Sequence, residues 1–238
     1  MTYDAVIFDL DGTLIDTEAT YRKAFHAAAA QFGLAAPRGF YSRLVGLAST
    51  ERAPLLRQTF GAAFDTAGFL RAYYAHRAAL LPARIPVRSG AALLLRLVGA
   101  PKAIATSASR GTALRHLERA GLSAHFTVVV TRDDVARGKP LPGAFLEAAD
   151  RLSVAPADCV AVEDSGVGVA AAYAAGMRVA MIARSPPSAT GRQCVRVFPD
   201  LVPLRRWLVP GAHPSGAEPV PPASHSREPG RPSFVVTA

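Results

Sequence analysis

The chain has 238 residues, half of them hydrophobic, so it is long enough to bury a sizeable core. No uncharged apolar stretch approaches the roughly 18 residues of a membrane span, and the start, Met-Thr-Tyr-Asp, lacks the features of a secretion signal. The formal charge of +9 comes from scattered arginines that form no basic stripe typical of a nucleic-acid binder. We therefore expect a cytoplasmic protein, a monomer or weak dimer, that binds neither membranes nor nucleic acids.

The first predicted element is a strand over 3–10, a nearly continuous apolar run typical of a parallel sheet covered on both faces. Asp9 and Asp11 follow at its end, and side chains two residues apart on an extended chain point the same way. Gly12 lets the backbone turn sharply, so that amide N–H groups can approach an anion. This combination favours chemistry on a phosphate group, in which one carboxylate attacks while the other handles the proton.

Residues 15–83 are predicted to form an all-helical insertion. Helical spacing of apolar residues extends over 17–33, and helical stretches over 50–60 and 65–80 follow without a convincing strand between them. The insertion holds eight basic and four acidic residues, which suits an anionic substrate, although a solvated surface is the alternative. The cations that we expect to face the substrate are Arg22, Lys23, Arg43 and Arg52.

After Pro86 the pattern alternates between helix and strand. Strands are predicted over 102–106, 127–131, 158–163 and 178–182, with helices over 90–97, 111–120, 142–152 and 168–175. This rhythm predicts an α/β fold with a doubly wound parallel sheet, its first strand near the centre and a ligand crevice at the carboxyl ends of the strands. The expected domains are a core (1–14 and 84–208), a helical cap (15–83) and a tail (209–238) rich in Pro, Gly and Ser, which is predicted to be disordered.

Four separated segments each place polar groups just past the end of a predicted strand. Besides Asp9 and Asp11, these groups are Thr106-Ser107, Gly138-Lys139-Pro140 and Glu163-Asp164. Each group alone has an ordinary interpretation as a turn, a strand-end hydroxyl, a solvated lysine or a helix start. Together they predict one site that holds a phosphate group and a hard divalent cation such as Mg²⁺.

These segments resemble the haloacid dehalogenase (HAD) superfamily, specifically its phosphatase and β-phosphoglucomutase-like branch with a helical (C1) cap. The resemblance covers roughly residues 3–208, and its motifs occur in the family's order and spacing. The matching text is DLDGTLIDTE (9–18), ATS (105–107), DDVARGKPLPGAF (133–145) and VEDSGVGVAAAYAAGM (162–177). The resemblance implies a Rossmann-like core that is interrupted after its first strand by the cap.

The resemblance also implies a mechanism. Asp9 would be the nucleophile that forms an aspartyl phosphate, and Asp11 the general acid that then becomes the base activating water. Mg²⁺ would be held by Asp9, the backbone carbonyl of Asp11 and Asp164, with Glu163 nearby or acting through water. Lys139 would be the third catalytic residue, because it relieves repulsion between Asp9 and the phosphate. The residues implied in phosphate binding are Leu10, Thr106, Ser107 and Lys139.

Two departures bear on the reaction. Phosphoglucomutase-like members generally carry a His where Tyr21 stands, and an Arg three residues beyond the cap glycine, where Gly46 here leads to Ser49. Both departures favour a phosphatase for a small phosphorylated metabolite, a sugar phosphate or phosphoglycolate-like acid, over a hexose phosphomutase. A catalytically silent binding protein is the third alternative. Three histidines are expected to be structural or solvated: His26, His125 and His116, which is placed on the surface of a core helix.

Overall fold

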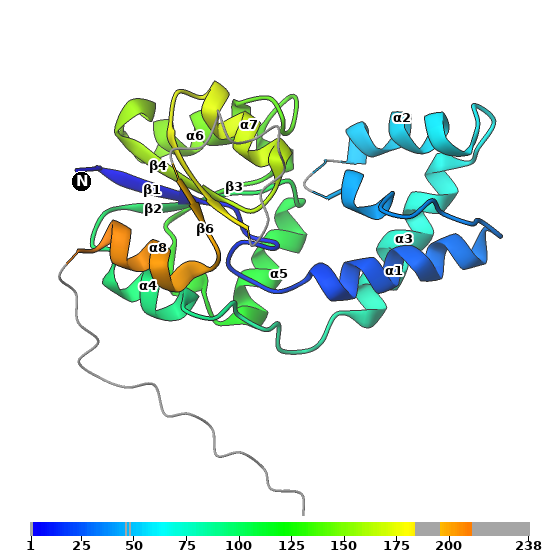
Figure 1. The fold of residues 1–238 in the computed structure, drawn as a ribbon, viewed down its shortest axis with the longest axis horizontal. Helices are drawn as coiled ribbons and strands as arrows, with labels where there is room; N and C mark the ends of the chain where they lie inside the picture. The colour runs from blue at the N-terminus through cyan, green and yellow to red at the C-terminus, as the bar shows by residue number, and fades with distance from the viewer. Residues whose placement is uncertain (1, 46, 48, 184–195, 211–238) are drawn as a thin grey trace, which may run out of the picture.

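The computed structural model describes residues 2–45, 47, 49–183 and 196–210, without the side chains of 49–51. Its core is a six-stranded parallel sheet in the order β3-β2-β1-β4-β5-β6 (Figure 1). The strands are β1 (Ala5–Phe8), β2 (Lys102–Ala105), β3 (Val128–Val130), β4 (Cys159–Glu163), β5 (Arg178–Ile182) and β6 (Arg196–Phe198). The predicted doubly wound parallel sheet is therefore confirmed, with β1 between β2 and β4.

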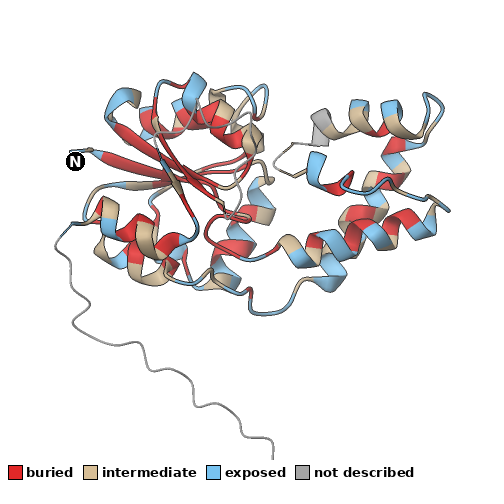
Figure 2. Cartoon of the chain, in the orientation of Figure 1, coloured by how far each residue is buried: buried red, intermediate tan, exposed pale blue. Residues whose placement is uncertain are grey.

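Helices cover both faces of this sheet, which explains why β1 reads as a continuous apolar run (Figure 2). Val6 and Phe8 pack in the cluster that includes residues of α4 (Ala91–Leu97), α5 (Arg110–Ala120) and α8 (Leu201–Leu208). Ala5 and Ile7 point to the opposite face, toward α6 (Gly143–Arg151) and α7 (Gly166–Ala174). The alternation of side chains along a strand thus divides β1 between two cores.

The insertion after β1 folds into three helices, α1 (Glu18–Gln31), α2 (Ser49–Phe60) and α3 (Thr66–Leu80), with a short 3₁₀ turn at Tyr41–Arg43. Figure 1 shows them as a separate lobe beside the sheet. They enclose a core of their own, in which the Phe25 and Phe69 rings meet edge to face with centroids 5.7 Å apart. We call this lobe the cap, and for its boundaries we keep 15–83 as a proposal, with 1–14 and 84–208 as the core.

Two connections join the cap to the core, and they run side by side. Ile15 forms an antiparallel bridge with Val87, and the amide of Asp16 donates to the carbonyl of Pro86 at 2.8 Å. The Arg88 guanidinium donates to the carbonyl of Gly12. The paired connections therefore lie directly beside the loop that carries Asp11.

One strand and one α-helix lie where the sequence predicted none. The strand β6 has only three residues, too few to show a period, and it is specified by pairing with β5. The helix α8 begins after Asp200, whose side chain accepts a hydrogen bond from the Val202 amide at 2.8 Å. Most of the predicted tail, residues 211–238, lies outside the described residues.

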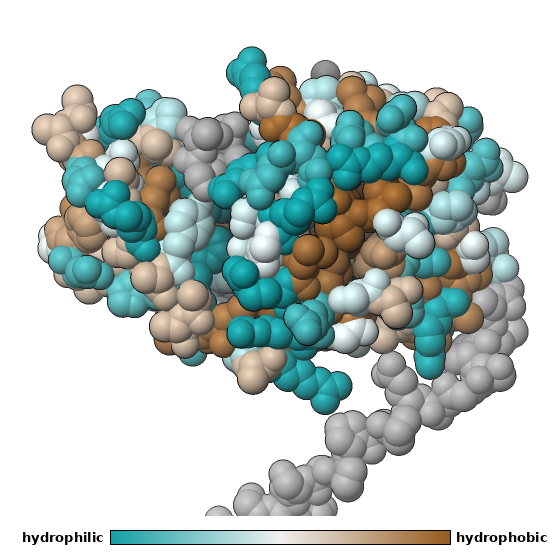
Figure 3. Space-filling model, turned by 180° about the vertical axis from the view of Figure 1, so that it is seen from behind, coloured by the Kyte–Doolittle hydropathy of each residue, from teal (hydrophilic) through white to brown (hydrophobic). Residues whose placement is uncertain are grey.

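The surface is mixed in polarity. Figure 3 shows the reverse face, where an apolar area on the core lobe is bordered by hydrophilic side chains. Within the described ranges, no helix combines the length and apolar character that crossing a membrane requires. Apolar residues serve mainly to build the three interior clusters.

Candidate active site

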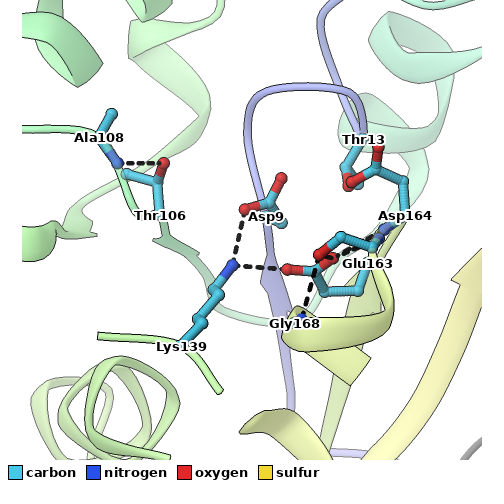
Figure 4. Close-up of polar contacts among 9 residues, drawn as sticks. Asp9, Thr13, Thr106, Ala108, Lys139, Glu163, Asp164 and Gly168 are labelled. Atoms are coloured by element: carbon cyan, nitrogen blue, oxygen red, sulfur yellow. Dashed lines mark hydrogen bonds and ion pairs between the residues drawn. The ribbon is translucent and has the colours of Figure 1, made fainter. Parts of the chain in front are cut away.

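The centre of the candidate site is Asp9, which directly follows the central strand. Its amide donates to the Val162 carbonyl of β4 at 2.9 Å, which fixes it at the carboxyl edge of the sheet. Its side chain is 10% exposed and lines a cavity of about 660 Å³. Lys139, only 1% exposed, places its Nζ atom 2.7 Å from Asp9 Oδ1 and 2.6 Å from Glu163 Oε1 (Figure 4). Three segments far apart in sequence therefore meet at one lysine.

Burial dominates the electrostatics of this cluster. It raises the pKa of Asp9 well above the usual range, although the charge of Lys139 opposes this effect, and the charges of Glu163 and Asp164 add to the rise. Burial also acts to lower the pKa of Lys139, but the two carboxylates that it contacts outweigh burial and raise that pKa. The lysine is therefore a fixed positive charge beneath the cavity.

Glu163 is fully occupied by donors. Its Oε2 atom accepts hydrogen bonds from the amides of Asp164 and Ser165 at 2.9 and 2.8 Å and from the Ser165 hydroxyl at 2.9 Å. Its Oε1 atom accepts a hydrogen bond from Lys139 Nζ. A Cβ atom at Gly168 would lie 1.7 Å from Glu163 Oε1, so only glycine fits beside this carboxylate. We infer that Glu163 mainly orients Lys139.

Asp164 lies next to the glycine turn after β1. Thr13 donates to its Oδ1 atom at 3.2 Å, and a Cβ atom at Gly12, whose φ is +93°, would lie 2.1 Å from Oδ2. Burial, followed by the charge of Glu163, raises the pKa of Asp164 to about 7. Oxygen atoms of Asp9, Glu163 and Asp164 lie within 4.8 Å of one another. The charge of Glu163 repels Asp9 and Asp164. Because Glu163 is occupied by donors, Asp9 and Asp164 are the members of this set that can offer hard oxygen ligands to a divalent cation such as Mg²⁺.

Without a divalent cation, this repulsion predicts a pH-dependent stability. The pKa of Asp164 is about 7 in the folded protein and near 4 when unfolded, so the folded state binds more protons between pH 4 and 7. The free energy of unfolding in EDTA should therefore fall as pH rises through this window, by at most about 1.4 kcal/mol per pH unit for this group. Urea titrations in EDTA at several pH values measure the free energy of unfolding of the wild type and of Asp164→Asn, and the variant should show the smaller fall with pH. Equal pH dependence in both proteins would contradict the prediction.

The residues predicted to bind phosphate lie at the same sheet edge. Thr106 directly follows β2, and its hydroxyl oxygen accepts from the Ala108 amide at 3.1 Å, which leaves the O–H free to donate (Figure 4). Thr106 and Ser107 both line the cavity. The side chain of Leu10 is buried in the core, so only its backbone amide can serve a substrate. The binding roles of these residues stay predictions.

Asp11 makes contacts that the sequence did not indicate. Its Oδ1 atom accepts from the Thr17 hydroxyl at 2.9 Å and from the Tyr21 hydroxyl at 2.8 Å, and His116 Nδ1 lies 3.1 Å away. Burial acts to raise the pKa of Asp11, but the hydrogen bond and charge of His116, followed by the charge of Arg77 and the Tyr21 hydrogen bond, lower it to about 2. These donors favour the carboxylate form of Asp11, whereas a phosphate dianion bound beside it would favour the protonated form.

The prediction that His116 lies on the surface of a core helix was wrong. The residue is 3% exposed and lines the cavity. It lies on the buried face of α5 with Ala113 and Leu117, and this spacing of three and four residues was the signal that could have placed it there. Arg115, directly before His116, and Glu118, two residues after it, obscured the pattern.

The cap contributes a wall of aromatic and cationic residues to the cavity. Of the four cations predicted to face the substrate, only Arg52 lines the cavity, and it donates to the Tyr74 hydroxyl at 3.0 Å. Arg77, which was not predicted, lies with its guanidinium carbon 3.4 Å from the centre of the Tyr21 ring. The other cap residues that line the cavity include Tyr41, Leu44, Tyr73 and Tyr74. Arg22, Lys23 and Arg43 are exposed, because they project from the outer faces of their helices.

Comparisons with known proteins agree with this geometry. The family model of haloacid dehalogenase-like hydrolases matches residues 3–176. The Phosphorylated carbohydrates phosphatase of Thermotoga maritima is 32% identical over 177 residues, 73% of this chain and 82% of that protein. The Beta-phosphoglucomutase of Bacillus subtilis is 31% identical over 206 residues, 83% and 91% of the two chains. CbbY from Rhodobacter sphaeroides, solved in complex with phosphate, superposes with a TM-score of 0.71 at 30% identity, covering 85% of this chain and 96% of that one.

Proposed function

The chain belongs to the haloacid dehalogenase-like hydrolases, and on this premise we propose that it is a Mg²⁺-dependent phosphatase acting on a small phosphorylated metabolite through an aspartyl phosphate on Asp9. The predicted family and the enzyme class, a phosphoric monoester hydrolase, are confirmed by the named relatives. The observation that carries the proposal is the buried cluster in which Lys139 bridges Asp9 and Glu163 at 2.7 and 2.6 Å, beside Asp164.

In the first step, an Asp9 oxygen attacks phosphorus and the bond between phosphorus and the ester oxygen breaks. The leaving alkoxide takes a proton from the Asp11 carboxyl group and departs as an alcohol. Thr106, which lines the cavity, and Lys139, which contacts the cavity-lining Asp9, are suited to hold the phosphoryl oxygens.

In the second step, water attacks the phosphorus of the aspartyl phosphate. Its proton passes to the Asp11 carboxylate, the bond to Asp9 breaks, and inorganic phosphate leaves. Covalent catalysis thus replaces one difficult displacement by two easier ones, and Asp11 returns to its protonated form for the next cycle.

The carboxylates of Asp9 and Asp164 and the backbone carbonyl of Asp11 are the proposed ligands of Mg²⁺. When bound, Mg²⁺ supplies positive charge that offsets the charge of the phosphate and the carboxylates. Glu163 contributes through Lys139, because its own oxygens are already occupied. Lys139 contacts two of the three carboxylates in this cluster, so a further cation is needed before the cluster can accept a phosphate dianion.

The cavity wall supports a small anionic or polyhydroxylated leaving group, such as a sugar or a glycolate-like acid. Arg52 and Arg77 line the cavity, and neither forms an ion pair with a carboxylate of the described residues. Tyrosines of the cap also line the cavity, and Arg52 donates to the Tyr74 hydroxyl at 3.0 Å. Cations and hydroxyls are the groups that recognise carboxylates and sugar oxygens.

The test is a phosphatase screen over phosphorylated metabolites, with and without EDTA. We expect phosphate release that EDTA abolishes and added Mg²⁺ restores, and release that is unchanged in EDTA would contradict the proposal. The relative named Beta-phosphoglucomutase keeps a hexose phosphomutase as the second candidate. Isomerised sugar from β-glucose 1-phosphate and its bisphosphate primer, in place of free phosphate, would favour it. The absence of turnover on the whole panel would favour a binding protein.

A further inference from the structure

Three donors from two lobes converge on one oxygen of Asp11. Thr17 and Tyr21, in the cap, donate their hydroxyl hydrogens to Oδ1 at 2.9 and 2.8 Å. His116, in the core, places Nδ1 at 3.1 Å from the same atom. The other oxygen, Oδ2, accepts no hydrogen bond within the part of the chain that the structure describes, and Asp11 lines the cavity. One oxygen is thus held, and the second is available to a substrate.

These contacts are specific rather than incidental packing. Thr17 stands at the N-cap of α1, yet its hydroxyl is not used to cap the helix and donates to Asp11 instead. Arg77 stacks on the Tyr21 ring at 3.4 Å, which fixes the direction of the Tyr21 hydroxyl. His116 is 3% exposed, so its ring nitrogens depend on protein partners. Its partners are Asp11 Oδ1 and the Tyr21 hydroxyl, 3.3 Å from Nε2.

His116 differs from the two hydroxyl donors in its location. Thr17 and Tyr21 follow the connection at Ile15 and belong to the cap lobe, whereas α5 packs on the sheet through Ala113 and Leu117. Asp11 itself directly follows the central strand of that sheet. The contact between His116 and Asp11 therefore lies within the core and does not depend on the position of the cap relative to the core.

Building on the proposed phosphatase activity, we propose that His116 is a positioning residue, which holds Oδ1 of Asp11 so that Oδ2 exchanges the proton with the substrate. In the first step that proton passes from Asp11 to the leaving-group oxygen, and in the second it returns from the attacking water. Because a carboxylate oxygen only accepts, the proton in this contact is on His116 Nδ1. An N–H donor at this position is the property that the role requires.

The role predicts a dependence on the leaving group. An alkoxide needs a proton to depart, whereas nitrophenolate is stable without one. Misplacing Asp11 should therefore slow the first step for alkyl phosphates but not for p-nitrophenyl phosphate. The second step, hydrolysis of the aspartyl phosphate, should slow for both, since it is the same reaction after either substrate.

The experiment compares His116→Asn, whose amide nitrogen can take the place of Nδ1, with His116→Gln and His116→Leu, which do not place a donor there. All are assayed with Mg²⁺ on p-nitrophenyl phosphate and on the alkyl phosphate that the wild type hydrolyses fastest. For the Gln and Leu variants we expect kcat/KM to fall about 10- to 100-fold on the alkyl phosphate and less than about 3-fold on the aryl phosphate. A burst of nitrophenolate should appear with the aryl ester. The Asn variant should stay close to the wild type.

The matched control is His26→Asn. His26 is an exposed histidine of α1 outside the cavity lining, so this variant should keep the wild-type kcat/KM on both substrates. Equal losses of kcat/KM on both esters would assign His116 a purely structural role and overturn the inference, as would unchanged kinetics on both. If the Leu variant does not fold, the contrast between Asn and Gln still decides. Failure of the inference leaves wild-type turnover intact, whereas failure of the proposed function removes that turnover itself and overturns both.

Discussion

Asp9→Asn should lower kcat on the best substrate by about 10⁵-fold, because an amide cannot attack phosphorus to form the covalent intermediate. Asp9 directly follows β1, and its side chain both lines the cavity and contacts Lys139. Steady-state kinetics measure the loss. Labelled phosphate from the substrate should also be trapped on the wild-type chain after acid quench, and not on the variant.

The same substitution should leave the fold intact. Lys139 keeps its contact with Glu163. Burial, and then the charges of Glu163 and Asp164, raise the pKa of Asp9 in the wild type, and a neutral side chain at position 9 removes both unfavourable effects. We expect a free energy of unfolding within about 1 kcal/mol of the wild type. Asp150→Asn, an exposed position on α6, serves as the control with full activity. A variant at Asp9 that kept more than about 1% of kcat would refute its role as the nucleophile.

Lys139→Met should have the largest effect on stability. The substitution leaves Asp9 and Glu163, two buried carboxylates, without the cation that bridges them at 2.7 and 2.6 Å. Removing one partner of a buried ion pair costs about 3–5 kcal/mol, because the remaining charges stay uncompensated. Urea unfolding in EDTA measures this loss, and phosphatase activity should fall in parallel because the phosphoryl group loses its fixed positive charge.

Added Mg²⁺ should restore part of the lost stability, and it should stabilise Lys139→Met more than the wild type. A bound cation lies close to the same carboxylates and replaces some of the missing charge. Lys23→Met, an exposed position on α1, is the matched control and should lose little stability in either condition. If Lys139→Met were as stable as the control in EDTA, the bridging lysine would not hold the cluster together.

The sheet made much of the site predictable. Asp9, Thr106 and Asp164 follow β1, β2 and β4, and parallel strands end at one edge, so an apolar run followed by a polar group was enough to bring these residues together. The loop with Lys139 does not directly follow a strand in the structure. Its cation was nevertheless predicted to join the site, and its role beside Asp9 came from the resemblance to the family. The structure puts its Nζ atom between the two carboxylates.

The cap was predicted less well, and the reason lies in helix geometry. A helix presents a new direction every residue, so composition alone could not tell that Arg52 lines the cavity while Arg22 and Arg43 face solvent. Arg77 was missed because its partner, the Tyr21 ring, belongs to another helix. Its place on the cavity wall depends on how α1 and α3 pack.

The sequence by itself determined the parallel sheet, the helical insertion and the acidic pair at Asp9 and Asp11, because each depends on residues close together in the chain. Only the tertiary structure decided that Glu163 is occupied by Lys139 and neighbouring donors, and that His116 contacts Asp11. Lys139 and Glu163 lie 24 residues apart in the chain, and His116 and Asp11 lie in two different elements of the core, so these contacts form only when the loops and helices pack on the sheet.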